Sequence, residues 1–234
     1  MSTDFHFQAI GFIHSPYKEK FGIPRQPGLV TAARIELHLD QHIPASSLDD
    51  IEGFSHLWLT FVFHEHIERG WQPRIRPPRL GGNRRVGVFA SRSPFRPNPI
   101  GLSVVPLLGI RHAANHSILE LGGADLLDGT PILDIKPYVP FVDSHPEARG
   151  GFVDAPPPQH IVSWDEPLEQ HLQQLERGGF PDLRLLLRQV LAQDPRPAYQ
   201  KGQDGRRYGL RLYDFNILFE ASDDGFAVVA IESL

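Results

Sequence analysis

Proline and glycine interrupt this sequence at short intervals, and their spacing limits the folds that the chain can adopt. The 22 Pro and 21 Gly residues stand between short apolar runs and form no repeat. Neither residue is well tolerated inside a long helix, so the pattern favours many turns that join short strands. The apolar runs are also rich in β-branched and aromatic residues, which are typical of strands. We therefore predict a mainly β protein.

The first 145 residues contain most of the runs that we expect to form strands. FHFQAIGFIH (5–14) and LVTAARIELHL (29–39) are joined by a long loop, and HLWLTFVFHEH (56–66) follows a short capped helix predicted in SSLDDIEGF. RVGVFA, IGLSVVPLLGI and SILELGGADLL supply further strands. LLDGTPILDI is predicted to form a hairpin, because Asp128-Gly129 is a common hairpin turn. A series of short strands of this kind predicts a β-barrel over residues 1–145.

A second, smaller domain is predicted after a linker at residues 146–160, which includes three consecutive prolines. Leu168, Leu172 and Leu175 recur at helical spacing behind Asp165, a suitable N-cap, and PDLRLLLRQVLAQD repeats the helical pattern. RRYGLRLYDFNILFEA and GFAVVAIE are expected to form a terminal hairpin. Residues 161–234 are thus predicted to form a C-terminal α+β domain.

Several chemistries are excluded by residues and motifs that the sequence lacks. It has no cysteine, which excludes disulfides, thiolate zinc sites and cysteine nucleophiles. It contains no GxGxxG, P-loop or GxSxG motif, the usual signatures of Rossmann cofactor binding, NTP binding and a hydrolase nucleophile elbow. The first 20 residues carry neither a basic leader nor a long apolar segment, so we expect a cytoplasmic protein without a membrane anchor.

Arginine is concentrated in one part of a chain that is acidic overall. The formal net charge is -5, yet residues 70–99 contain seven arginines and no acidic side chain. Guanidinium groups suit phosphates and base edges, so this segment is predicted to contact nucleic acid through Arg84, Arg85 and Arg96. A solvated basic edge is the alternative. A second group of basic residues alternates with tyrosines that either stack on bases or pack in the core. Its members are Arg196, Tyr199, Lys201, Arg206 and Arg207.

Two further segments carry groups that are suited to ligand binding. The loop SRSPFRPNPIGLSVV (91–105) contains three prolines, which stiffen it either as a binding loop or as a structural corner. His64, Glu65 and His66 also invite a metal site, because strand alternation would place both imidazoles on one face. No third ligand follows at a fixed spacing, so a metal-dependent hydrolase that uses His64 and His66 is the less favoured alternative.

Five segments together resemble one known family: SPYKEKFGIPRQPGL, RPPRLGG, SRSPFRPNPIGLS, DLLDGTPILDIKPYVP and AQDPRPAY. They occur in the order that is typical of the TrmO family, also called YaeB-like or TsaA-like proteins, and the resemblance spans nearly the whole chain. It implies a homodimeric tRNA methyltransferase that binds S-adenosylmethionine on its β-barrel. Its implied reaction methylates N6 of N6-threonylcarbamoyladenosine at position 37 of the anticodon loop. We expect the C-terminal domain to contact the tRNA.

The resemblance also implies which residues bind the cofactor. They are Pro24, Arg25 and Gln26 in the first long loop, His64 and Glu65 at a strand end, Arg92 and Leu102 beside the proline-rich loop, and Asp125, Leu126, Leu127 and Asp128. Lys136 is our hypothesis for a residue of the catalytic site that holds the threonyl carboxylate of the substrate, with a structural salt bridge as the alternative. No metal is predicted. A non-enzymatic RNA-binding module is the other alternative function.

Overall fold

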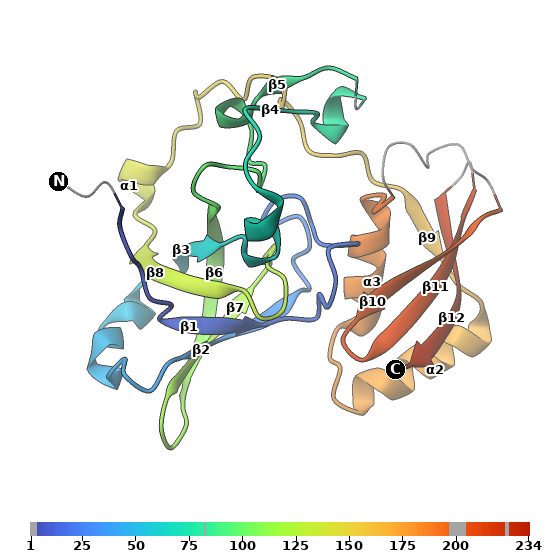
Figure 1. The fold of residues 1–234 in the computed structure, drawn as a ribbon. Coiled ribbons are helices and arrows are strands. Elements are labelled where there is room, and N and C mark those ends of the chain that lie inside the picture. The colour runs from blue at the N-terminus through green and yellow to red at the C-terminus, as the bar shows by residue number, and fades with distance from the viewer. Residues whose placement is uncertain (1–3, 82, 197–204, 223–224) are drawn as a thin grey trace.

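The chain folds into a β-barrel followed by a smaller α+β part, and the computed structural model describes residues 4–81, 83–196, 205–222 and 225–234 (Figure 1). Within these residues six antiparallel strands close into a barrel in the order β1-β2-β7-β6-β3-β8, and β8 pairs back with β1. They are β1 (Gly11–His14), β2 (Arg34–Leu39), β3 (His56–Val62), β6 (Ile100–His112), β7 (Ser117–Gly122) and β8 (Pro131–Pro137). The predicted β-barrel is confirmed.

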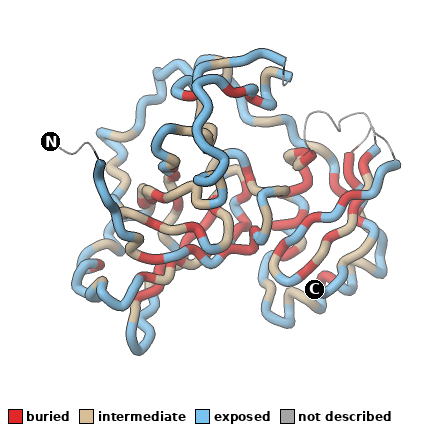
Figure 2. Tube along the Cα trace, viewed as in Figure 1, coloured by how far each residue is buried: buried red, intermediate tan, exposed pale blue. Residues whose placement is uncertain are grey.

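Alternating apolar side chains fill the barrel. Leu57, Leu59 and Phe61 of β3 are buried, and the residues between them face the other side of the strand. Leu37 of β2 and Leu119 of β7 are fully buried in the same core. Figure 2 shows buried stretches along the barrel strands, with exposed segments concentrated in the loops. Closure leaves the six barrel strands without a free edge, which explains how such short strands remain stably paired.

The chain leaves the barrel between β3 and β6 in a long excursion. It contains a 3-10 turn at His64–Arg69, the two-stranded sheet of β4 (Arg74–Ile75) and β5 (Val86–Gly87), and further 3-10 turns at Pro78–Leu80 and Val88–Ala90. The predicted strands are therefore wrong at HEH and in most of RVGVFA. Val62 pairs with Ile100, the first residue of β6, so beyond Val62 the chain has no partner strand. Likewise SSLDDIEGF forms two 3-10 turns, Ala45–Leu48 and Ile51–Gly53, without side-chain caps.

The hairpin predicted around Asp128-Gly129 is also wrong. β7 pairs with β2 and β6, whereas β8 pairs with β1 and β3, so the strands on either side of this turn are not neighbours. The turn itself exists, and Gly129 adopts a positive φ of 74°, which a glycine accommodates without strain. Its amide groups bond outside the turn: the Gly129 amide donates to the Ile13 carbonyl and the Asp128 amide to the Tyr17 carbonyl. Residues 123–130 thus form an irregular segment against the N-terminal strand.

The C-terminal part is a four-stranded sheet covered by two helices. After the short helix α1 (Pro140–Asp143), the chain forms β9 (Ile161–Ser163), α2 (Glu166–Arg177), α3 (Leu183–Ala192), β10 (Arg207–Leu212), β11 (Phe215–Ser222) and β12 (Gly225–Ser233). Both predicted helices are confirmed, and the Asp165 side chain caps α2 by accepting from the Leu168 amide at 3.0 Å. The predicted terminal hairpin forms between β11 and β12, but its first arm, RRYGLRLYDFNILFEA, is two strands, because the chain turns at Tyr213, whose φ is 52°. No helix in the described residues is both long and apolar enough to cross a membrane.

The long loop between β1 and β2 joins the two parts. Tyr17, Val30, Ala32 and Ala33 are buried in the same core as the C-terminal helices and sheet, away from the interior of the barrel. The Tyr213 amide donates to the Pro16 carbonyl at 2.8 Å, and Tyr17 forms an isolated bridge with Leu212. The first loop is therefore packed on the C-terminal part, although it lies in the N-terminal half of the sequence.

Candidate active site

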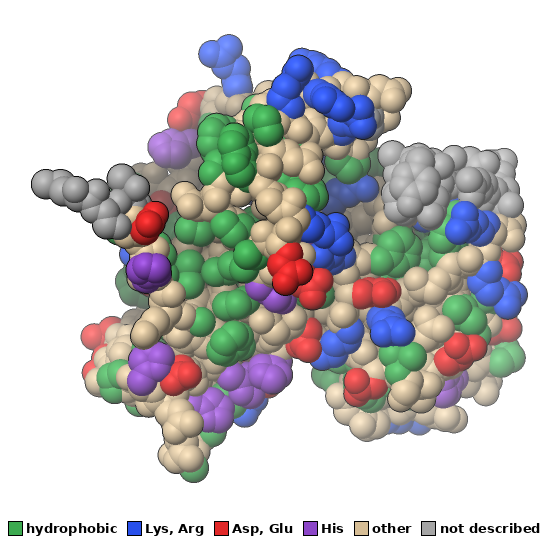
Figure 3. Space-filling view, in the orientation of Figure 1, with side chains coloured by type: hydrophobic (Ala, Val, Ile, Leu, Met, Phe, Trp, Pro, Cys, Tyr) green, Lys and Arg blue, Asp and Glu red, His purple; other side chains and the backbone are tan. Residues whose placement is uncertain are grey.

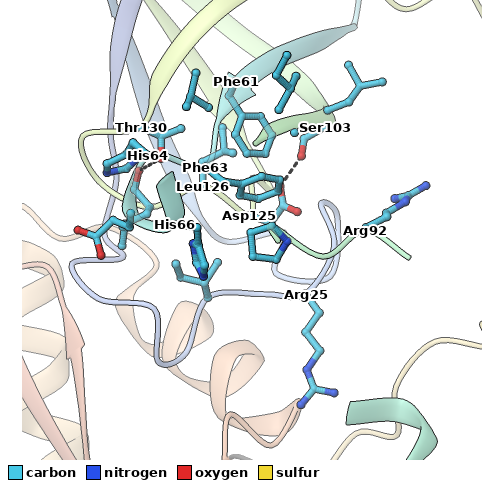
Figure 4. A pocket seen from close by; sticks show the side chains of 18 of the residues that line it. Arg25, Phe61, Phe63, His64, His66, Arg92, Ser103, Asp125, Leu126 and Thr130 are labelled. Atoms are coloured by element: carbon cyan, nitrogen blue, oxygen red, sulfur yellow. Dashed lines mark hydrogen bonds between the residues drawn. The ribbon is translucent and has the colours of Figure 1, made fainter. Parts of the chain in front are cut away.

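A cavity of about 540 Å³ opens at the end of the barrel where β1, β3 and β7 finish. Four stretches of the chain line it, within residues 20–26, 58–66, 91–103 and 125–130. A cavity of this size is typical of a binding site for a small molecule. The lining residues come from segments far apart in the sequence, and Figure 4 shows several of their side chains converging on this space.

Asp125 supplies a carboxylate inside the cavity. The Ser103 hydroxyl donates to its Oδ1 at 2.7 Å, the contact drawn as a dashed line in Figure 4. Burial raises the pKa of Asp125 above its ordinary value, while the bond from Ser103 and the charge of Arg92 oppose that rise. A partly dehydrated carboxylate gains much from a cationic ligand, because the ligand's charge replaces the solvation that burial removes.

One wall of the cavity is apolar and aromatic. Phe61 and Leu126 are buried, and the rings of Phe61 and Phe63 meet edge to face with their centroids 5.1 Å apart. The His66 ring packs against both Phe63 and Phe95. Burial lowers the pKa of His66, and the charges of Lys20 and Arg69 lower it further, so its imidazole is neutral at neutral pH. The wall suits a flat heterocycle.

Cationic groups border the cavity on another side. Arg25 and Arg92 both line it, and the Arg92 guanidinium donates to the Gln26 side-chain oxygen, which links the first loop to the proline-rich loop. Lys20 forms an ion pair with Glu65, with 3.2 Å between Nζ and Oε2. A hydrogen bond from Lys20 and its charge lower the pKa of Glu65. The cavity thus combines carboxylates and guanidinium groups with an apolar surface.

Helix α3 fixes the position of the loop that carries Arg25 and Gln26. The Ala32 amide donates to the Gln189 side-chain oxygen at 2.9 Å, and Gln189 Nε2 donates to the Thr31 hydroxyl at 2.9 Å. Gln193 Nε2 donates to the Leu29 carbonyl at 3.0 Å. One wall of the cavity is therefore held in place by the C-terminal part of the chain.

Comparison with known proteins identifies the family. The tRNA-methyltransferase O N-terminal domain matches residues 12–144, and the TrmO C-terminal domain matches residues 157–234. The chain belongs to the TrmO family. A tRNA (adenine(37)-N6)-methyltransferase of Escherichia coli (strain K12) is 52% identical over 233 residues, which cover 98% of this chain and 99% of that protein.

Two matches from Pseudomonas aeruginosa, one in sequence and one in structure, extend the comparison. A putative S-adenosylmethionine-dependent methyltransferase is 50% identical over 212 residues, which cover 89% of each chain. A crystal structure of TrmO superposes with a TM-score of 0.81 at 39% identity and covers 100% of this chain and 99% of that one. The TrmO resemblance seen in the sequence is confirmed over both parts of the fold.

The structure brings together most of the residues that the TrmO resemblance assigns to the cofactor. Residues of all the implied segments line the cavity: Pro24, Arg25, Gln26, His64, Glu65, Arg92, Leu102, Asp125, Leu126 and Leu127. His64 and His66 lie in a 3-10 turn, so the strand alternation that motivated a metal pair does not apply to them. Within the described part of the chain, no group of three or more histidine or acidic side chains is arranged to hold a metal ion.

Asp128 and Lys136 are not among the residues that line the cavity. Asp128 accepts from the Ser15 amide at 2.8 Å and pairs with Lys18 at 2.9 Å, so its carboxylate fastens the turn to the first loop. Lys136 is 70% exposed and pairs with Asp134 at 2.7 Å. The alternative of a structural salt bridge describes Lys136 better than a place in the catalytic site.

Several cavity residues were missed by sequence reasoning. Phe61, Phe63 and Ser103 lie at the ends of strands and look like ordinary core or strand residues in the sequence. In the sequence, the one feature that could have identified them was that they lie close to residues assigned to the cofactor, which follow β3 and flank the proline-rich loop before β6. Thr130 follows the Asp128-Gly129 turn, and its hydroxyl donates to the Leu127 carbonyl at 2.7 Å.

The predicted tRNA-binding residues divide into exposed and structural groups. Arg84 and Arg85 are exposed, and Figure 3 shows Lys and Arg side chains gathered over the β4–β5 region. Arg196 is only 7% exposed and pairs with Asp194 at 2.8 Å, which corrects its assignment as an RNA contact. Arg206 lies over the Tyr208 ring, and Arg207 pairs with Glu220 at 2.9 Å. Tyr199 and Lys201 lie outside the described residues.

Proposed function

We propose that this chain is an S-adenosylmethionine-dependent tRNA methyltransferase that methylates N6 of adenosine 37 in the anticodon loop. The observation that carries the proposal is the 52% identity, over nearly the whole of both chains, to a protein named for that activity. The cavity at the end of the barrel supports it, because its groups match the chemistry of the cofactor.

The cofactor has two cationic centres, one carboxylate and a flat adenine ring, and the cavity offers a partner of suitable chemistry for each. Asp125, to which Ser103 is the one side-chain hydrogen-bond donor in the part of the chain that the structure describes, suits a cationic centre. Arg25 and Arg92 suit a carboxylate. The aromatic wall of Phe61 and Phe63 suits the adenine. We assign cofactor binding to the ten implied residues that line the cavity, without Asp128.

When bound, the cofactor supplies an electrophilic methyl group. The chain's own residues have mainly to position the target adenosine and to exclude water, since proximity and orientation carry much of the catalysis in such a transfer. N6 of the target adenosine must also lose a proton when it is methylated. His66 is a neutral base on the cavity wall, because burial and nearby cations lower its pKa, so it is the residue that we assign to receive this proton.

The finer parts of the proposal concern the substrate and the assembly. We propose that the target adenosine carries the N6-threonylcarbamoyl group, that the enzyme acts as a homodimer, and that it works in the cytoplasm. These statements follow from the TrmO resemblance of the sequence. The C-terminal part would contact the tRNA through residues other than the buried Arg196.

Mass spectrometry of tRNA nucleosides tests the proposal. The full-length protein is incubated with S-adenosylmethionine and tRNA that either carries or lacks the threonylcarbamoyl group, and the nucleosides are then separated. We expect a mass gain of one methyl group on the modified adenosine at position 37. Methylation of the unmodified adenosine instead would contradict the assigned substrate.

A thermal-shift measurement separates the alternative functions. The cofactor and its demethylated product should both raise the melting temperature, because a ligand that binds only the folded state stabilises it. No thermal shift with either compound in a protein that still binds tRNA would favour a non-enzymatic RNA-binding module. Stabilisation by divalent metal, but not by the cofactor, would favour the hydrolase.

A further inference from the structure

Phe89 is a large apolar side chain left exposed beside the cavity. It is 75% exposed and lies in the 3-10 turn Val88–Ala90, directly before the cavity residues Ser91 and Arg92. The neighbouring Val88 is buried, whereas Phe89 buries only a minor part of its surface, so packing within the fold does not account for a phenylalanine here. At the edge of the cavity, the exposed ring is available to contact a molecule that enters there.

The turn that carries Phe89 is held firmly in place. Arg96 donates to the carbonyls of Val88 and Ser91, at 3.3 and 2.8 Å. The Ser91 hydroxyl donates to the Val88 carbonyl at 2.8 Å, and the Val88 amide donates to the Pro73 carbonyl at 3.0 Å. The ring is therefore presented on a rigid support, which lowers the entropy that a partner must overcome.

Arg96 connects Phe89 to the cavity. Its guanidinium carbon lies 5.6 Å from the centre of the Phe89 ring, and the same side chain lines the cavity. The ring and the guanidinium group together offer a flat surface next to the opening. Such a combination of an aromatic ring with an arginine stacks well on nucleobases of any sequence.

The charge around Phe89 selects the class of partner. The arginine-rich segment (residues 70–99) has seven arginines and no acidic side chain. A protein surface that met this segment would need matching acidic groups, whereas RNA supplies negative charge along its whole backbone and bases for stacking. The surface therefore fits an RNA strand better than a second copy of this chain, whose formal net charge is only -5.

We propose that Phe89 is a stacking platform for the nucleobase next to the target adenosine when RNA lies across the arginine-rich segment. This inference rests on the proposed function and adds a residue that positions the substrate. An adenosine that enters the cavity must leave the base stack of its loop, so a neighbouring base loses a stacking partner. Phe89 replaces that partner at the mouth of the cavity, with Arg96 beneath it.

Substitutions of Phe89 test the platform in the full-length protein. We expect Phe89→Ala to weaken tRNA binding about 5- to 150-fold, the range found for loss of one base–aromatic stack. Phe89→Trp should keep wild-type affinity. Phe89→Leu should behave like the alanine variant, because it retains apolar volume but offers no flat ring. In steady-state methylation the loss should fall mainly on KM for tRNA, with kcat and S-adenosylmethionine affinity little changed.

Phe5→Ala is the matched control, because Phe5 is 80% exposed but precedes β1 and does not line the cavity. Wild-type tRNA affinity in Phe89→Ala, or full rescue by Phe89→Leu, would overturn the stacking role. A change of oligomeric state in Phe89→Ala, measured by light scattering, with tRNA affinity unchanged would show that this surface joins two copies of the chain. RNA binding is measured without methyl transfer, so a wild-type protein that binds tRNA but does not methylate it overturns the proposed function alone.

Discussion

At the scale of single residues, Asp125 is held where its negative charge is disfavoured. Burial raises its pKa, while hydrogen bonds from the Ser103 hydroxyl and from the backbone, together with the charge of Arg92, partly oppose the effect. Because the folded state binds this proton more tightly than the unfolded state does, stability is lost as pH rises from about 3.9, the usual aspartate value, through the raised pKa. A bound cation would relieve this cost.

Asp125→Asn should therefore raise the stability of the ligand-free protein and weaken its binding of the cofactor. Asparagine can still accept the bond from Ser103 but carries no charge, so the ligand-free variant should melt higher than the wild type at pH 7. The difference should shrink as pH is lowered toward 4, because the raised pKa of Asp125 makes the wild-type carboxyl increasingly protonated there. Calorimetry should show at least a tenfold loss of S-adenosylmethionine affinity at pH 7. An equal melting difference at both pH values would show that the charge of Asp125 is not the cause.

Charged residues were the least predictable part of the site, because their partners lie far away in the sequence. Asp128 was expected to contact the cofactor, but it bonds Ser15, 113 positions earlier. Arg196 was expected on the surface, yet it pairs with Asp194 and packs on Phe226. In both cases the residue type and the neighbouring sequence would look the same for a ligand-binding residue and for a structural one. Only the tertiary fold decides whether such a charge meets solvent or a buried partner.

At the scale of elements, the sequence predicts which segments form strands and helices better than it predicts where they end or what they pair with. The leucines at helical spacing are enough to predict α2 and α3, because a helix forms its backbone hydrogen bonds within its own segment. β3 instead ends at Val62 because β6 begins at its partner Ile100, and this information is not local. The turn at Tyr213 and Asp214 carries no Gly, Asn or Pro, and a single Asp was too weak a turn signal, so β10 and β11 looked continuous.

The contact between α3 and the first loop leads to a prediction about cofactor binding. Gln189→Ala removes the acceptor for the Ala32 amide, which is buried, and leaves that amide without its partner at a cost of about 1 to 3 kcal/mol. The loop that carries Arg25 should then shift, and S-adenosylmethionine affinity should fall several-fold although Gln189 lies outside the cavity. Gln170→Ala on α2, whose side chain bonds Glu166 of the same helix, is the control. Unchanged cofactor affinity in Gln189→Ala would contradict a bracing role for α3.

At the scale of the whole molecule, RNA binding depends more on where the charges lie than on the net charge. A chain with a net charge of -5 repels RNA on average, while residues 70–99 present arginines without acidic neighbours in the sequence. Some of these arginines are engaged within the fold: Arg79 binds the Ala155 carbonyl in the linker, and Arg96 binds the turn at Val88. Arg84 and Arg85 are exposed and have no ion pair among the described residues. These two are the strongest candidates for phosphate contacts.

The salt dependence of tRNA binding should therefore respond to Arg84 and Arg85 but much less to Arg207. Each phosphate contact that is lost should reduce the slope of log affinity against log salt by about 0.7 to 0.9, because fewer counterions are released. We expect the double variant Arg84→Gln/Arg85→Gln to bind tRNA more weakly at low salt and with a shallower slope between 50 and 200 mM salt, a range suited to this test. Arg207→Gln should keep nearly the wild-type slope, because Glu220 already neutralises Arg207. S-adenosylmethionine affinity, measured in parallel, should not change in either variant. If Arg207→Gln reduced the slope as much as the double variant does, tRNA would have to displace Glu220, and the RNA-binding surface would extend over β10 of the C-terminal sheet.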